Sequence, residues 1–352
     1  MPTHKTHNFT SFKYDIFEVR LQSSKRDIKP STIASYAFAM MRFIRSKYPT
    51  WKKEEPYFEK LRELVKTDGY VENFLTSVGD ATANSILAVI IVGLSPDGRY
   101  LWRDGMKDYG QKLNELLKDR KDKYYNKIAK QILTPNQKLK WTDWETLMAI
   151  HKKYKRKIKW FKMGKSIYGD SVKCVNQAEL LQMYLVASLY LIMPPRRLEY
   201  AGMKVILKKD WEKKPNGEKA NYLVWDGNPR GYSKKKFFIF GDYKTVKKYG
   251  IQRINITREL NTVINMWLSA RTASSSEYLL VNKNGKKMTP NGLSKFIQKT
   301  FRESGKEVSA TMLRHIYVSN IFKDDTTQVE KEFLARAMGH SVATQQITYV
   351  KH

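Results

Sequence analysis

The stretch MPPRRLEYAGMKVIL, residues 193–207, marks the point at which the sequence changes from helical to strand periodicity. Before it, residues 180–193 form an apolar run that predicts a buried helix, which Pro194 and Pro195 bring to an end. From Met203 onward the pattern changes to period two, which is typical of short strands. The chain therefore combines helices with a sheet.

Strand-like text continues from this point, interrupted by the turn signals Pro-Asn-Gly and Asp-Gly-Asn-Pro. The short runs between these turns predict a small antiparallel sheet that is inserted among helices. The predicted strands cover residues 203–207, 222–225, 237–240 and 251–256.

Helical periodicity accounts for most of the remaining chain. The first 130 or so residues are expected to be all-helical, because apolar positions recur at helical spacing throughout them. Thr289 followed by proline is a helix start, and Gly305 and Gly339 are helix stops. The predicted fold class is mainly α with a small antiparallel β-sheet. Helices after the sheet are expected at residues 258–269, 290–303, 310–322 and 329–338.

The chain has 352 residues, a length that favours two domains. A densely charged segment, residues 119–130, is followed by Thr134-Pro135-Asn136, which interrupts the helical pattern. We place the domain boundary there, with a first domain over residues 1–131 and a second over residues 132–352.

The composition favours a polyanionic partner. The chain carries 65 Lys and Arg against 34 Asp and Glu, a net charge of +31. Charge alone leaves a ribosomal or membrane-surface protein open, but 41% hydrophobic and 12% aromatic residues favour a folded chain over a disordered basic arm. The basic text HKKYKRKIKWFK, residues 151–162, fits a solvated helix face and a strip facing phosphates equally well.

Several kinds of site are excluded or not expected. Cys174 is the only cysteine, which excludes an intramolecular disulfide or a multi-cysteine zinc site and favours a reducing compartment; no structural metal is expected. The N-terminus does not read as a signal peptide, and the apolar runs are shorter than the roughly 20 residues needed to span a bilayer. No P-loop, HExxH or GxSxG motif occurs.

Four motifs in the second half of the chain carry the candidate chemistry. They are Pro195-Arg196-Arg197-Leu198-Glu199, Tyr243-Lys244-Thr245, Leu313-Arg314-His315, and Gly339-His340-Ser341 with Tyr349 nine residues after the histidine. In this order and at this spacing they resemble the active-site series of the tyrosine recombinases, or phage-type integrases. The text YKTVKKYGIQRINI and the Pro-Pro-Arg-Arg-Leu-Glu start are similar to the branch from large DNA viruses, virophages and related mobile elements.

The resemblance implies a helical core-binding DNA-binding domain followed by an α+β catalytic domain. It also implies cleavage and rejoining of DNA through a 3′-phosphotyrosyl bond to Tyr349, without a cofactor. Arg196 and Arg314 suit the charge that develops on the phosphate oxygens, because a guanidinium can engage two oxygens in a planar fork. The resemblance also implies that Lys244 is the general acid, which gives a proton to the leaving 5′ oxygen. It implies that His340 hydrogen-bonds the phosphate and assists the tyrosine. Competing lysines are Lys234, Lys235, Lys236, Lys247 and Lys248.

Three further residues are expected to support this set. Glu199 is expected to orient an active-site cation or histidine. Thr311 stands where the family has a histidine, and its hydroxyl can donate a hydrogen bond but does not titrate near neutral pH. His315 lies about 100° around the helix from Arg314 and is expected to be a supporting residue. Arg197 is expected to be a structural or backbone-contacting neighbour.

The leading function is therefore a site-specific DNA recombinase or integrase. Double-stranded DNA is its expected partner, a homotetramer on paired sites its expected assembly, and a membrane is not expected. Only three residues follow Tyr349, which leaves the coupling of protomers open. An intracellular location is expected, the host nucleus or a viral replication compartment if the protein is viral. A type-IB topoisomerase or telomere resolvase is the alternative enzyme, and a noncatalytic DNA-binding descendant is the alternative of a different class.

Overall fold

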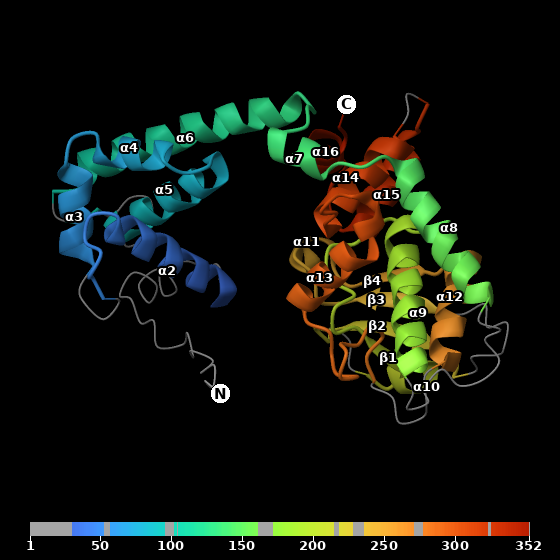
Figure 1. Ribbon diagram of the computed structural model, residues 1–352. Helices are drawn as coiled ribbons and strands as arrows, with labels where there is room; N and C mark the ends of the chain where they lie inside the picture. Colours follow the sequence, from blue (N-terminus) through green and yellow to red (C-terminus); the bar gives the residue numbers. More distant parts are fainter. Residues whose placement is uncertain are drawn as a thin grey trace. The chain divides into compact units, whose positions relative to one another are not determined.

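The computed structural model describes residues 30–52, 57–95, 102–103, 105–160, 172–214, 218–227, 236–270, 277–322 and 325–351. The chain divides into two compact units, residues 1–127 and residues 128–352 (Figure 1). Each unit has a hydrophobic core of its own. The two units are described separately.

All the secondary-structure elements in the described part of the first unit are helices. Its elements are α2 (Pro30–Arg45), α3 (Phe58–Lys66), α4 (Tyr70–Thr76), α5 (Asp80–Leu94) and the long α6 (Lys107–Ala129), which runs into the second unit. Helix α5 packs against α2, α3 and α4. Its nearly unbroken apolar sequence follows from this position, since a helix with neighbours on several sides buries most of its surface.

The second unit is built around one apolar helix, α9 (Val172–Leu191), which contacts α8, α12, α13 and α14. This is the run that precedes the quoted stretch, and its burial on several sides explains why it shows little amphipathic pattern. The unit's helices are α7 (Pro135–Lys140), α8 (Trp144–Trp160), α10 (Lys208–Trp211), α11 (Val246–Tyr249), α12 (Arg258–Ala270), α13 (Pro290–Thr300), α14 (Ala310–Ile321), α15 (Gln328–Met338) and α16 (Val342–Thr344). The 3₁₀ turn η2 (Arg302–Ser304) follows α13, and the π-helical turn η3 (Gln345–Tyr349) follows α16.

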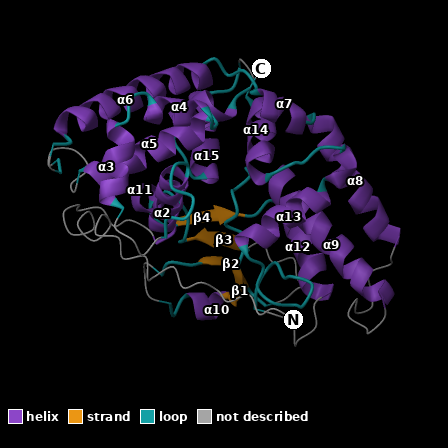
Figure 2. Cartoon of the chain, turned by 60° about the vertical axis from the view of Figure 1, so that its left-hand side comes forward, coloured by secondary structure: helices purple, strands orange, loops and turns teal. Residues whose placement is uncertain are grey.

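The sheet has four strands in the order β1 (Lys204–Leu207), β2 (Asn221–Trp225), β3 (Phe237–Phe240) and β4 (Gln252–Asn255) (Figure 2). The strands lie where the sequence predicts them, but the sheet is mixed and not wholly antiparallel. Strands β2, β3 and β4 pair antiparallel, whereas β1 pairs parallel with β2. The connection over residues 208–220 contains α10 and is long enough to return the chain to the same end of the sheet.

Both faces of the sheet are covered, and side chains alternate between them. Leu223, Phe238 and Phe240 join the main core with α9, while Tyr222 and Ile239 pack on the opposite face. On that face the ring of Trp211 from α10 lies 5.5 Å from the ring of Tyr222. This double burial is why β3 reads as an unbroken apolar run.

The helix-boundary signals are mostly confirmed. Thr289 caps α13 by accepting from the Gly292 backbone, and Gly305 and Gly339 adopt the left-handed conformation at helix ends. The helical pattern is interrupted between α6 and α7 as predicted, and Thr134 also forms a capping box that starts α7. Among the described residues, no helix has the length and apolar character of a membrane span.

Candidate active site

Four segments of the second unit bring the predicted site residues together. The loop between α9 and β1 supplies Arg196, α14 supplies Arg314 and His315, and the turn between α15 and α16 supplies His340. The turn η3 carries Tyr349 and packs against both α14 and α16. Residues that are more than 150 positions apart in sequence therefore meet: the Arg197 side chain touches the Tyr349 hydroxyl.

Gly339 makes the close packing of these segments possible. It ends α15 with φ of +73°, a conformation that costs little for glycine alone. A Cβ atom at this position would lie 2.8 Å from Nη1 of Arg196. The glycine therefore serves the backbone turn and also leaves room for the arginine.

Arg196 is 1% exposed and is fixed by one of its terminal nitrogens. Nη1 donates to the Gln252 side chain at 2.9 Å and to the Ala337 carbonyl at 2.8 Å. The guanidinium also lies over the ring of Phe240, 4.1 Å from its centroid. Nε and Nη2 are buried and donate to no described residue, so three of the five N–H donors of this guanidinium are free to bind an anion.

Arg314 is fully buried and held in the same manner. Its Nη1 donates to the carbonyls of Pro195 and Met338, at 2.6 Å and 3.2 Å, and its Nε has no partner among the described residues. The carbonyl of Pro195 belongs to the break that ends α9, so the proline turn also positions the second arginine. The guanidinium carbon lies 4.6 Å from the ring centroid of Tyr349.

Tyr349 is 3% exposed, and its hydroxyl accepts a hydrogen bond from Nη2 of Arg197 at 3.4 Å. Burial alone would raise the pKa of this phenol, but the charges and hydrogen bonds of Arg314 and Arg197 outweigh burial and hold it below its usual range. Other buried tyrosines behave in the opposite way, since burial raises the pKa of Tyr200 and Tyr317. The site thus stabilises the phenolate of this tyrosine.

His340 stacks on Tyr349, with ring centroids 4.9 Å apart and an angle of 20° between the planes. Burial, followed by the charge of Arg314, lowers the pKa of His340 to about 3, so the imidazole is neutral at pH 7. Nδ1 lies 3.2 Å from the Ser341 carbonyl and must donate to it, because a carbonyl only accepts. Nε2 is then an unprotonated acceptor, and it has no partner among the described residues.

His315 holds the backbone of the tyrosine and not its hydroxyl. Its Nδ1 lies 3.3 Å from the Tyr349 carbonyl, and its Nε2 lies 3.4 Å from the side-chain amide nitrogen of Gln137. Ser319, one turn further along α14, accepts from the Lys351 backbone at 2.8 Å. These contacts hold the carbonyl of Tyr349 and the backbone two residues after it, and the supporting role of His315 stays a prediction.

Lys244 lies in the connection between β3 and β4, and its side chain is exposed. The residues on either side are fixed, because the Tyr243 hydroxyl donates to the Gly250 carbonyl and the Thr245 hydroxyl to the Gly339 carbonyl, both at 2.6 Å. Thr245 thereby ties this connection to the turn that carries His340. Among the competing lysines, Lys236 is buried at the start of β3, and Lys234 and Lys235 lie outside the described residues.

Glu199 and Thr311 have fewer contacts. The negative charge of Glu199 acts on both Arg196 and Arg314, although it forms no ion pair with a cation in the described ranges. Thr311 is exposed in the first turn of α14. The parts assigned to these two residues stay predictions.

Arg197 makes a contact that the sequence did not predict. It was expected to be a structural neighbour, yet its guanidinium reaches the hydroxyl of Tyr349. The one available signal was its position in the pair Arg196-Arg197. Two adjacent residues in a loop can turn toward the same side, whereas in a strand they would face opposite sides.

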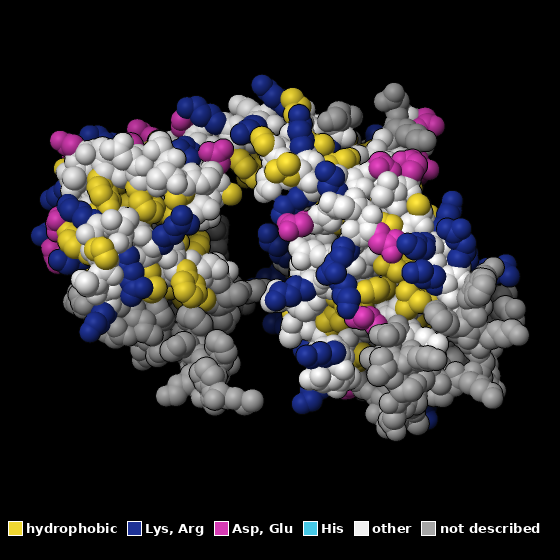
Figure 3. Space-filling view, viewed as in Figure 1, with side chains coloured by type: hydrophobic (Ala, Val, Ile, Leu, Met, Phe, Trp, Pro, Cys, Tyr) yellow, Lys and Arg dark blue, Asp and Glu magenta, His cyan; other side chains and the backbone are white. Residues whose placement is uncertain are grey.

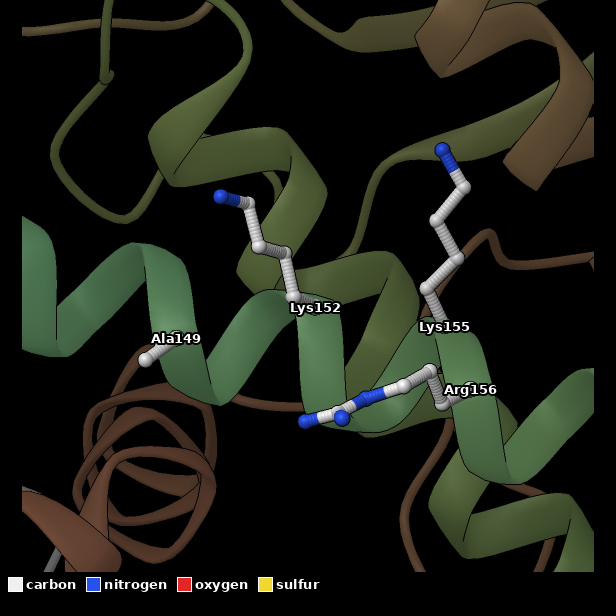
Figure 4. Close-up of a pocket in the computed structure, with 4 residues that line it drawn as sticks. All are labelled: Ala149, Lys152, Lys155 and Arg156. Atoms are coloured by element: carbon white, nitrogen blue, oxygen red, sulfur yellow. The ribbon is translucent and has the colours of Figure 1, made fainter.

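Lys and Arg side chains are spread over the surface of both units (Figure 3). The basic segment of α8 is one such region. His151, Tyr154 and Ile158 face the core, while Lys152, Lys155 and Arg156 are exposed and line a surface pocket with Ala149 (Figure 4). Lys153 and Lys155 are paired with Glu303 and Glu259. The segment is therefore an amphipathic helix whose exposed side is basic.

The chain is similar to one protein family and to several solved structures. Residues 232–352 match the model of the phage integrase family. No curated protein sequence matches the chain. Among solved structures, the XerA recombinase is 13% identical with a TM-score of 0.34, and the alignment covers 96% of this chain and 93% of that one. The XerH site-specific recombinase, bound to a palindromic difH substrate in a post-cleavage complex, is 13% identical with a TM-score of 0.37, covering 92% and 94%.

The family match lies within the second unit, which also carries the four sequence motifs. The matched residues make up about a third of the chain, and the match agrees with the resemblance to the phage-type integrases that the sequence motifs predict. The helical fold with a small four-stranded sheet is also the one expected. The narrower placement among integrases of large viruses and mobile elements stays a prediction.

Proposed function

We propose that the protein cleaves and rejoins double-stranded DNA with Tyr349 as the nucleophile. The observation that carries this proposal is the set of buried, unpartnered nitrogen atoms around the tyrosine. They are Nε and Nη2 of Arg196, Nε of Arg314 and Nε2 of His340, none of which bonds to a described residue. The arginine nitrogens are donors, and a buried donor without a partner is costly, so a site that retains several of them is built for a ligand with several acceptor oxygens; Nε2 of His340 is instead a free acceptor for a proton. A phosphodiester has that chemistry.

The proposed reaction forms one bond and breaks one. The Tyr349 oxygen attacks phosphorus, the bond from phosphorus to the 5′ oxygen breaks, and a 3′-phosphotyrosyl bond results. The phenol proton passes to Nε2 of His340, and Lys244 gives a proton to the leaving 5′ oxygen. Attack by the freed 5′ hydroxyl of a second strand reverses these steps and rejoins the DNA. The phosphodiester energy is kept in the covalent bond, so no nucleotide hydrolysis is required.

The charge balance of the site fits this sequence of events. Arg196 and Arg314 meet the negative charge that develops on the nonbridging oxygens, and both are held by backbone carbonyls before any ligand arrives. An entering phosphate also raises the pKa of His340, because an anion favours the protonated imidazole. The histidine then becomes a better base at the moment the tyrosine must lose its proton.

The partner and the assembly are parts of the same proposal. A net charge of +31 supports binding to DNA, with residues 1–131 as the core-binding domain and residues 132–352 as the catalytic domain. A homotetramer on two paired sites is the assembly that strand exchange between duplexes requires. Recombinant products from a plasmid with two sites would support it, whereas supercoil relaxation by a monomer without recombinants would favour a topoisomerase.

The decisive experiment traps the covalent intermediate. A nicked duplex that loses a short fragment after cleavage cannot be rejoined, so adduct accumulates on the protein. The duplex is first selected from a random-sequence pool by its binding to the full chain. We expect a denaturation-resistant adduct with the unmodified protein and none with Tyr349→Phe. Adduct that persists in Tyr349→Phe, or maps to another residue, would refute the proposal; Tyr317→Phe is the matched control on α14.

A further inference from the structure

Arg197 lies beside the reacting atom, although the family series does not include it. Its Nη2 is 3.4 Å from the Tyr349 hydroxyl oxygen, and its side chain is partly exposed. Its backbone carbonyl accepts a hydrogen bond from the hydroxyl of Tyr190, a buried residue near the end of α9. The backbone of Arg197 is therefore anchored to α9, although the residue lies in the loop that follows this helix.

We propose that Arg197 is a further catalytic residue, which donates to the Tyr349 oxygen and stabilises the negative charge that this oxygen gains as its proton leaves. The inference rests on the proposed function, since it assigns Arg197 to the same strand-cleavage step. Arg197 is not the base, because a guanidinium stays protonated at any pH of interest. The proton still passes to His340, and Arg197 lowers the free energy of the phenolate that is left behind.

The arginines around the tyrosine fall into two groups with different roles. Arg196 and Arg314 have unpartnered donors for phosphate oxygens, whereas Arg197 already touches the nucleophile in the absence of DNA. Position 311, where the family has a titratable histidine, holds the exposed Thr311, which cannot carry charge. Arg197 supplies a permanent charge from a different segment of the chain.

The charged and titratable groups that face Tyr349 come from three elements. They are Arg197 from the loop after α9, Arg314 and His315 from α14, and His340 from the turn before α16; Glu199 acts on Arg314, and Lys351 acts on His315. Both histidines are neutral at pH 7, since burial lowers their pKa to about 4 and about 3. The arginines are thus the cations that act on the phenol at neutral pH.

The first test measures the nucleophile itself and needs no DNA. 3-Fluorotyrosine is placed at position 349, and its ionisation is followed by ¹⁹F NMR as the pH is raised. We expect Arg197→Gln to raise the pKa of this phenol by roughly 1 unit or more, and Arg197→Lys to raise it less. Arg253→Gln is the control, because Arg253 stacks on Phe237 at 3.8 Å and lies on β4. An equal pKa in Arg197→Gln and the parent protein would overturn the inference.

The second test uses the nicked duplex and its methylphosphonate analogue, in which one charged phosphate oxygen is replaced by a neutral methyl group. Arg197→Gln should form adduct about 10-fold more slowly at pH 7, with the difference shrinking as the pH rises and the phenol ionises unaided. The neutral analogue should partly rescue Arg196→Ala but not Arg197→Gln. Rescue of Arg197→Gln would show that Arg197 serves the phosphate, and would overturn the assignment.

The two tests fail in different ways. If the parent protein forms no adduct on any selected duplex, the proposed function is wrong, and the ¹⁹F titration still reports whether Arg197 stabilises the phenolate. If adduct forms but neither the titration nor the pH profile responds to Arg197→Gln, the cleavage chemistry stands. The proposal that Arg197 stabilises the phenolate is then refuted. Thermal unfolding of each variant guards against misfolding.

Discussion

The imidazole of His340 lies nearly parallel to the ring of Tyr349, with centroids 4.9 Å apart. The two residues are joined by α16 and the wider turn η3, in which the Val350 backbone donates to the Gln345 carbonyl. Ser341 starts this path by capping α16 through the Thr344 backbone. The spacing of nine residues is thus the length of chain needed to fold the tyrosine back over the histidine.

Substitution of Gly339 separates backbone strain from crowding at Arg196. Gly339→Ala places a methyl group 2.8 Å from Arg196 Nη1 in a left-handed turn, whereas Gly305→Ala meets the same strain, at φ of +69°, with nothing within 4 Å. Both changes should lower the free energy of unfolding by about 1–2 kcal/mol, measured by denaturant titration. Only Gly339→Ala should also abolish adduct formation. Equal adduct yields in the two variants would show that Arg196 does not need this space.

Replacing Arg314 by lysine should be severe although charge is conserved. Lysine lacks the planar fork that binds two backbone carbonyls while still presenting a free Nε toward a phosphate. We expect the rate of adduct formation to fall about 10²–10³-fold, the range for loss of one transition-state donor. Arg253→Lys, which changes an arginine elsewhere in the sheet, is the control and should keep its rate. A rate within a few-fold of the parent would contradict this part for Arg314.

Thr245→Val tests the anchoring of Lys244. Valine keeps the shape of threonine but removes the 2.6 Å hydrogen bond to the Gly339 carbonyl. We expect a stability loss of about 1 kcal/mol and a roughly 10-fold slower adduct rate, with DNA affinity unchanged. Thr262→Val removes a threonine hydrogen bond on α12 and provides the comparison. Equal effects of both substitutions on the rate would mean that the Thr245 contact does not position Lys244.

Three buried histidines predict that stability falls in acid. Burial lowers the pKa of His151 and His315 to about 4 and that of His340 to about 3, below the ordinary value of 6.5. Because the unfolded chain then binds more protons, stability is complete above about pH 6.5 and is lost as the pH falls toward 4. The upper limit is about 1.4 kcal/mol per histidine and pH unit. The melting temperature should therefore drop between pH 7 and 5, less steeply in His151→Gln; an unchanged slope would contradict the assignment.

The exposed side of α8 decides between the two interpretations of the basic segment. If Lys152 and Arg156 contact phosphates, their joint replacement by alanine should make the slope of log affinity against log salt less negative by roughly 1.8. Lys299→Ala removes a lysine that is paired with Glu179 and serves as the control. We expect the smaller slope in the double variant, measured by fluorescence anisotropy with a labelled duplex. An unchanged slope would show that this side of α8 faces only solvent.

Local sequence patterns predicted the helices and strands well, because each pattern depends only on how neighbouring residues are buried. Residues 237–240 are a strand in the sequence prediction and in the structure, since four apolar residues between turns suit a strand buried on both faces. The direction of β1 was predicted wrongly. A hydrophobic pattern of period two predicts which side chains of a strand lie on the buried face of a sheet. It does not predict which strand pairs with it or in which direction. That outcome depends on where the connection over residues 208–220 takes the chain.

By itself the sequence determined which side chains are available for the chemistry and the order in which they occur. Arg196, Lys244, Arg314, His340 and Tyr349 are recognisable because spacing and neighbouring residues are properties of the chain. Tertiary structure alone decided that Arg197 reaches the Tyr349 hydroxyl, that Gly339 makes room for Arg196, and that His340 is neutral. Contact distances and burial depend on segments brought together from distant parts of the chain, and a pKa depends on both. A linear pattern contains no information on either until the chain is folded.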